Sequence, residues 1–166
     1  MSNLNLIVVS HPDDEILGCG GTCTLLAEKG EVVQPIILCG QVEARNRKPT
    51  NQKLYIDMKN ANKSLEFKKP ILGDFPNIKM NNVDHLEIVK YIEEYIKELN
   101  PKRIFTHHSS DLNDDHKQVS ESCQVASRFF QRNNLSTNLK MICLMETLSS
   151  TEWSYSSTYP NFAPNY

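Results

Sequence analysis

The 166-residue sequence lacks any apolar run long enough to cross a membrane, and it lacks an excess of one charge. A membrane-spanning helix needs about 20 apolar residues, and the N-terminal apolar stretch ends at His11 with no basic segment before it. We therefore expect neither a membrane span nor a signal peptide. The 18 basic and 20 acidic side chains nearly cancel, so there is no electrostatic basis for binding nucleic acid or an anionic membrane.

The cysteines exclude two further classes of protein. There are five of them, an odd number, and no two form a Cys-x-x-Cys pair. This argues against a disulfide framework and a cysteine-rich zinc site, and it favours reduced thiols in a cytoplasmic protein. No cysteine-enzyme signature surrounds Cys19, and "GCGG" at 18–21 lacks the spacing of a dinucleotide-binding loop.

The sequence does contain an alternation of strand-like and helix-like segments, which we assign to a single domain over 1–166. Runs rich in Val and Ile predict strands, and apolar residues at helical spacing predict helices. The predicted strands are 4–9, 32–39, 70–72, 103–106 and 141–145, and the predicted helices are 18–28, 51–66, 86–99 and 119–130. This order predicts an α/β, Rossmann-like three-layer fold with a mostly parallel sheet and helices on both faces.

Two polar segments follow predicted strands. The first is "SHPDDE" at 10–15, and the second is "HHSSDLNDDH" at 107–116. In an open α/β sheet, ligands bind beyond the carboxyl ends of the strands. The fold therefore brings both segments to the same edge.

The side chains of these segments match the ligands of a catalytic zinc site. His11, Asp14 and His116 offer two nitrogens and one oxygen, which leaves a fourth position open. Asp13, next to a ligand, is placed to take a proton from a zinc-activated water. The alternative is that Asp13 and Asp14 cap the following helix, where acids are common. We expect Glu15 to support the site by accepting bonds from backbone N–H groups of the facing loop.

"SHPDDEILGCGGT" and "THHSSDLNDDH", with "VEARNR" and "LGDFPN" between them, resemble the LmbE-like, PIG-L-type de-N-acetylases. The resemblance covers the chain from Leu4 to about Trp153. It implies a zinc hydrolase acting on N-acetylglucosamine-type groups, with another divalent ion such as Fe²⁺ as an open alternative. It implies zinc on His11, Asp14 and His116, and Asp13 as the general base.

The resemblance also suggests roles around the metal. Arg45 resembles the family arginine that meets the substrate, and the alternative is a solvated loop charge. From its place after a predicted strand, His108 is our candidate for a second substrate contact. His107 and His108 are equal candidates to face the crevice, and the alternative is that they only bond the loop. Asp111 and Asp115 are expected to orient the loop and the ligand imidazole.

Two features depart from the family pattern. Many members carry a histidine three residues before the last ligand, where this sequence has Asn113. We expect Asn113 to donate a hydrogen bond to the oxyanion of the reaction, and the alternative is that it caps a helix. The chain also ends soon after "APNY", whereas relatives continue and shape more of the substrate pocket.

Together these features predict a zinc-dependent hydrolase that removes acetate from an N-acetylated sugar, free or in a glycoconjugate. Two alternatives stay open: a non-catalytic sugar- or nucleotide-binding domain, and a zinc amidohydrolase with a different amide substrate. A homo-oligomer is also left open, because Tyr155, Tyr159 and Phe162 near the end of the chain could form a partner surface.

Overall fold

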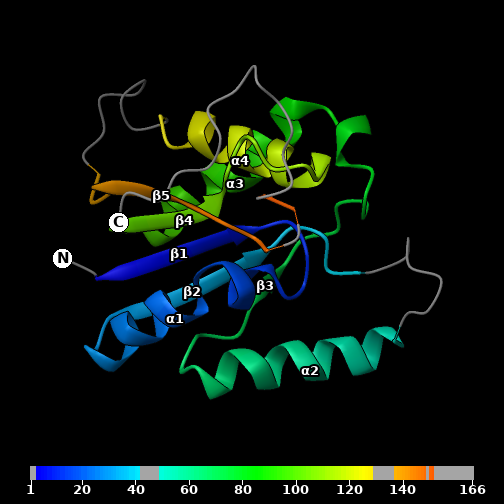
Figure 1. Cartoon of the computed structure of the whole chain (residues 1–166). Coiled ribbons are helices and arrows are strands. Elements are labelled where there is room, and N and C mark those ends of the chain that lie inside the picture. Colours follow the sequence, from blue (N-terminus) through cyan, green and yellow to red (C-terminus); the bar gives the residue numbers. More distant parts are fainter. Residues whose placement is uncertain (1–2, 42–48, 129–136, 149, 152–166) are drawn as a thin grey trace.

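The computed structural model describes residues 3–41, 49–128, 137–148 and 150–151 (Figure 1). In this part of the chain a five-stranded sheet has the order β3-β2-β1-β4-β5, and each pairing between neighbours is parallel. The strands are β1 (Leu4–Val9), β2 (Val32–Ile37), β3 (Ile71–Leu72), β4 (Arg103–His107) and β5 (Met141–Met145). The helices are α1 (Asp14–Glu28), α2 (Asn51–Ser64), α3 (His85–Leu99) and α4 (Asp114–Ala126), with a 3₁₀ turn η1 at Met80–Asn82.

The helices cover both faces of the sheet, which confirms the predicted three-layer α/β fold (Figure 1). Strand β1 lies in the middle and is apolar on both faces, as expected for a buried parallel strand. Its Leu6 and Val8 belong to a core shared with α3 and α4, whereas Ile7 and Val9 belong to a core shared with α1 and α2. None of the described helices is long and apolar enough to cross a membrane.

The strand order places a topological switch beside β1. The chain leaves β1 through α1 to reach β2 on one side, and it returns through α3 to reach β4 on the other side. The loops after β1 and β4 therefore diverge to opposite faces and leave a crevice at the carboxyl ends of these strands. Both polar segments identified in the sequence start there.

Two helices begin earlier than the sequence predicted. Helix α1 begins at Asp14 instead of Gly18, and α4 begins at Asp114 instead of Val119. The prediction left the acidic residues at these helix starts in the preceding loops, whereas the structure has Asp14 and Glu15 in the first turn of α1, and Asp114 and Asp115 in the first turn of α4. The remaining differences are small: β2 ends at Ile37, α2 at Ser64 and α4 at Ala126, while β4 extends to His107.

Candidate active site

The turn between β1 and α1 carries the first polar segment to the edge of the sheet. The Asp14 backbone N–H donates to the His11 carbonyl oxygen at 3.3 Å, which closes the turn. The Asp14 side chain folds back, because its Oδ2 accepts a 2.8 Å hydrogen bond from the His11 backbone N–H. The Asp14 carboxylate is therefore fixed beside the carboxyl end of β1.

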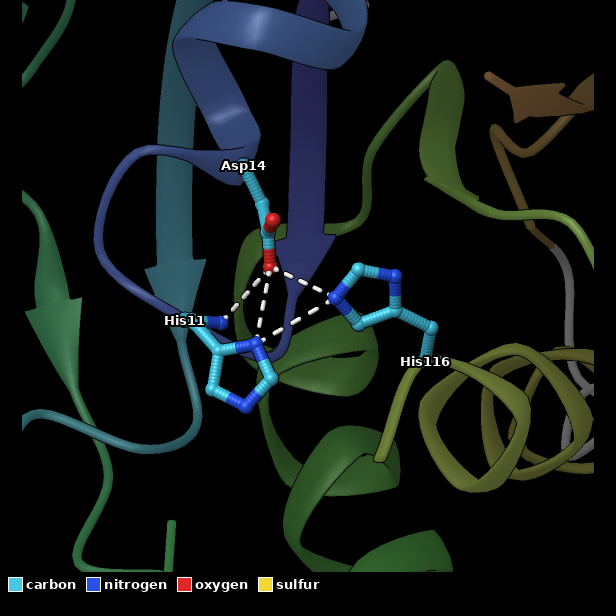
Figure 2. A group of neighbouring side chains, drawn as sticks. All are labelled: His11, Asp14 and His116. Carbon is cyan, nitrogen blue, oxygen red and sulfur yellow. Dashed lines mark hydrogen bonds and ion pairs between the residues drawn. The ribbon is translucent and has the colours of Figure 1, made fainter. Parts of the chain in front are cut away.

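Three ligand-type atoms form a nearly equilateral triangle at this edge (Figure 2). His11 Nδ1 lies 3.2 Å from His116 Nε2, and Asp14 Oδ2 lies 3.4 Å from each of these nitrogens. A tetrahedral ion with bonds of about 2.0 to 2.1 Å places its ligands about 3.3 to 3.4 Å apart. All three side chains are buried. The donor set and its spacing therefore fit a tetrahedral zinc ion without rearrangement.

The charges of the triangle are complementary before any ion binds. Burial alone would raise the pKa of Asp14, but the adjacent imidazoles of His107, His11 and His116 hold it well below its usual range. Burial would lower the pKa of His116, but Asp111 and Asp14 raise it to about 9. Protons on the imidazoles thus balance the carboxylate, and an ion must displace them to bind.

Each histidine of the triangle has a carboxylate behind it. His11 Nε2 lies 2.9 Å from Asp115 Oδ2, and His116 Nδ1 lies 3.0 Å from Asp111 Oδ2. The second pair is close enough for an ion pair but is not aligned as a hydrogen bond. A carboxylate favours a proton on the ring nitrogen that it faces, here His11 Nε2 and His116 Nδ1. The other nitrogen of each ring, which belongs to the triangle, is then free to bind a metal. The structure thus places Asp115 beside His11 and Asp111 beside His116.

These carboxylates are themselves anchored by neighbouring segments. Asp111 Oδ2 accepts hydrogen bonds from the hydroxyls of Ser150 at 2.9 Å and Thr151 at 2.7 Å. Asp115 accepts backbone N–H bonds from Ile78 at 2.6 Å and Met80 at 3.0 Å. The segments after β3 and β5 thus support the ligand rings from two sides.

The two neighbouring aspartates point differently, because Asp14 is buried whereas Asp13 is exposed. Asp13 is the N-cap residue of α1, but its side chain makes no cap hydrogen bond. Capping is therefore not the role of the Asp13 carboxylate. Its backbone has a φ of 114°, in the left-handed region that a residue with a Cβ rarely adopts. Such strain is concentrated at functional sites.

The partners expected for Glu15 were wrong. Its Oε2 accepts the Asp13 N–H of its own turn at 3.1 Å, and its Oε1 accepts the Asn62 amide of α2 at 2.8 Å, so neither bond comes from the facing loop. Glu15 is the second residue of α1, which packs on the α2 side of the sheet, away from that loop. Burial raises the pKa of Glu15.

Of the two adjacent histidines, His107 is the one that lies against the triangle. It is fully buried and stacks on His116 with ring centroids 3.8 Å apart, and its Nε2 accepts the Ser10 backbone N–H at 3.0 Å. Burial lowers the pKa of His107, so its ring is a neutral support. His108 Nδ1 bonds to Ser110, and the predicted substrate contact of His108 stays a prediction. Sequence reasoning missed the role of His107 because it ended β4 one residue early.

Asn113 caps the helix that carries His116. Its Oδ1 accepts the Asp115 backbone N–H at 2.9 Å, and its own N–H donates to Asp111 Oδ1 at 2.8 Å. The carbonyl oxygen of the Asn113 side chain is therefore engaged in the helix cap. The predicted hydrogen bond to an oxyanion could come only from its amide NH₂ group.

A second group of ligand-type atoms shares one member with the triangle. Cys39 Sγ lies within 4.8 Å of ligand atoms on His11 and Asp115. Burial and the nearby carboxylates of Asp115 and Asp14 raise the pKa of the Cys39 thiol to about 12. Because metals bind the thiolate, this group is the poorer site. Arg45, the predicted substrate contact, and Tyr155, Tyr159 and Phe162 lie outside the described residues.

Known proteins resemble this chain in sequence or in fold. The uncharacterized deacetylase YaiS of Escherichia coli (strain K12) is 28% identical over 134 residues, which cover 74% of this chain and 67% of YaiS. The N,N'-diacetylchitobiose deacetylase of Pyrococcus horikoshii superposes with a TM-score of 0.74 at 17% identity, covering 89% of this chain and 61% of that one. GalB, the 4-carboxy-2-hydroxymuconate hydratase of Pseudomonas putida KT2440, superposes with a TM-score of 0.67 at 19% identity, covering 86% and 62%.

The two solved structures show the fold alone, and one of them is a hydratase, so architecture does not decide the reaction. The sequence match is more specific. Residues 6–127 match the family described as PIG-L: GlcNAc-PI de-N-acetylase, and this segment contains His11, Asp14 and His116. Since the match covers well over half of the chain, the protein belongs to the PIG-L family of de-N-acetylases.

Proposed function

We propose that this protein is a zinc-dependent deacetylase that removes the acetyl group from an N-acetylated sugar of the N-acetylglucosamine type. The observation that carries the proposal is the triangle of His11, Asp14 and His116, whose edges of 3.2 to 3.4 Å match a tetrahedral ion. Membership of the PIG-L family supports the reaction class. The sequence match to the uncharacterized deacetylase YaiS supports it further.

The metal and the protein have separate tasks in this proposal. A zinc ion held by His11, Asp14 and His116 supplies Lewis acidity, which lowers the pKa of water to about 7 and polarises a carbonyl group. Asp111 and Asp115 hold the two ligand rings. Another divalent ion such as Fe²⁺ is compatible with two nitrogens and one oxygen.

Asp13 is the proposed general base. Its carboxylate is adjacent to a ligand, exposed to solvent and not engaged as a helix cap. It would accept the proton of the attacking water and return it to the departing amine nitrogen, so that acetate and a free amine leave. Asn113 contributes to this scheme as the cap that positions His116.

The proposed substrate rests on less evidence than the proposed metal site. The sugar class comes from the family, and Arg45 and His108 are the proposed substrate contacts. The chain spans 61 to 67% of the two deacetylases named above, so its own substrate range has to be measured. Two alternatives are a zinc amidohydrolase with another amide substrate and a non-catalytic sugar- or nucleotide-binding domain.

A screen of the metal-loaded protein tests the function. Acetate and free amine are measured with N-acetylglucosamine conjugates, with N-acetylated amino acids and with simple acetamides. We expect equimolar acetate and amine from the sugar conjugates only. Release from the non-sugar amides alone would assign another amidohydrolase, and stoichiometric zinc without any product would favour the binding domain. His85→Ala serves as a control, because His85 lies at the start of α3 and contacts Ser122 rather than the triangle.

A further inference from the structure

The conformation of Asp13 needs an explanation beyond the metal site. Asp13 has φ 114° and ψ −29°, although it is neither glycine nor engaged as a side-chain cap. A residue with a Cβ keeps such a conformation only where surrounding contacts enforce it. The question is which contacts do so.

A buried chain of hydrogen bonds connects this turn to α2. Glu15 Oε2 accepts the Asp13 backbone N–H at 3.1 Å, and Glu15 Oε1 accepts the Asn62 Nδ2 at 2.8 Å. Asn62 Nδ2 also donates to the Met58 carbonyl oxygen at 2.9 Å, which fixes the orientation of the amide. Glu15 is 1% exposed and Asn62 is 0% exposed. The strained backbone is therefore tied to a helix that supplies none of the ligands.

Stability alone does not account for Asn62. Its Oδ1 is buried without a hydrogen-bond partner in the described part of the chain. A buried acceptor without a partner is destabilising. The amide nitrogen of Asn62, in contrast, donates a hydrogen bond to Glu15. Unfavourable features such as a buried acceptor without a partner are retained mainly where a residue serves a functional site.

We propose that Asn62 is a positioning residue for the general base. Through Glu15, it holds the Asp13 backbone in the left-handed conformation that keeps the Asp13 carboxylate out of the helix cap. In the described part of the chain, Asn62 donates its hydrogen bonds to Glu15 and to the Met58 carbonyl oxygen, so it acts through Glu15. This inference rests on the proposed role of Asp13 in deacetylation.

Asn62→Asp tests the first link, because it places a carboxylate against Glu15 while preserving shape. We expect kcat to fall by about a hundredfold, the scale of a small displacement of a catalytic group, with KM and zinc content unchanged. Asn60→Asp is the matched control, since it makes the same charge change on the exposed side of α2 and should leave kcat at the parent value. Asn62→Leu also removes the hydrogen bond to Glu15, but without adding a charge, and we expect the same fall in kcat. This variant replaces Asn62→Asp in the test if the aspartate variant does not fold.

The double variant Glu15→Gln/Asn62→Asp tests the chain of bonds itself. Donor and acceptor exchange sides, because the glutamine amide donates to the new carboxylate while its oxygen still accepts the Asp13 N–H. Groups in one hydrogen-bond network are coupled, so the double variant should regain about tenfold or more of the kcat lost in Asn62→Asp. A merely structural role for Asn62 predicts no such recovery.

Crystal structures of the metal-free variants provide a readout besides activity. We expect the φ of Asp13 to leave the left-handed region in Asn62→Asp and Asn62→Leu, and to return to it in the double variant. A φ that stays near the parent value in the single variants, or unchanged kcat in them, overturns the inference. If the parent hydrolyses no acetamide, the proposed function fails, and the φ values still decide whether Asn62 controls the turn.

Discussion

At the scale of single residues, protons shared between the side chains of the triangle balance their charges when no ion is bound. His11, Asp14 and His116 lie close enough to share them. The raised pKa of His116, about 9 in the folded protein against 6.5 ordinarily, means that folding favours its protonated form. An ion that binds there has to release this proton.

This gives a prediction for pH. In the metal-free protein, the stabilisation linked to His116 is fully present below pH 6.5 and is lost as the pH rises through about 9. We therefore expect the free energy of unfolding from this group to fall between these values, and zinc affinity to rise over the same range. Denaturant unfolding and zinc titration from pH 6.5 to 9.5 measure both. His116→Ala should weaken both trends, with His11, whose pKa is also raised, contributing the remainder. Unchanged trends in this variant would point to another group.

The two aspartates can be separated in the same way. Asp13→Asn should keep zinc and lose activity by a hundredfold or more, roughly the scale of general-base loss. Asp14→Asn should lose zinc, because three ligands leave little redundancy. Metal analysis and turnover of the two purified variants decide between them. Loss of zinc in Asp13→Asn would mean that the roles of the two aspartates are exchanged.

At the scale of elements, both ligand-bearing helices begin at the site. Asp14 is the first residue of α1, and His116 is the third residue of α4. The sequence predicted the elements and the meeting of the polar segments, because apolar periodicity and strand alternation are local signals. It could not give the helix starts, since Asp14, Glu15, Asp115 and His116 are polar residues whose burial depends on contacts with distant segments. Nor could it give the Asn62–Glu15 bond, which joins two helices.

The cap of α4 makes a prediction at this scale. Asn113→Ala removes the acceptor for the Asp115 N–H, which should cost about 0.5 to 2 kcal/mol of stability and weaken zinc binding by displacing His116. Asn113→Asp is the control, because aspartate caps equally well and should bind zinc like the parent. Calorimetric zinc titration of both variants provides the measurement. Unchanged zinc affinity with reduced turnover in the alanine variant would instead support an oxyanion contact.

At the scale of the whole molecule, the triangle joins the two halves of the sheet. His11 and Asp14 follow β1, whereas His116 comes from α4 after β4. An ion bound to all three therefore stabilises the packing of the α1–α2 half against the α3–α4 half. Ions that bind only the folded state stabilise it by mass action.

Removal of the metal should therefore lower the melting temperature of the whole domain in one transition. At a free zinc concentration a thousandfold above Kd, the expected stabilisation is about 4 kcal/mol. Thermal unfolding with zinc and with a chelator measures it. The melting temperature of His116→Ala should respond weakly to zinc, and an equal response in this variant would place the stabilising ion elsewhere.

The 105-residue separation between His11 and His116 also sets an order of events during synthesis. A ribosome exposes β1, His11 and Asp14 first, but the third donor appears only when α4 has been translated. Until then a nascent chain offers zinc one imidazole and one carboxylate from this site, too few for tight capture. If zinc binds as proposed, metal loading would wait for the docking of β4 and α4 on β1, and zinc uptake on stalled ribosomes would report when that docking occurs.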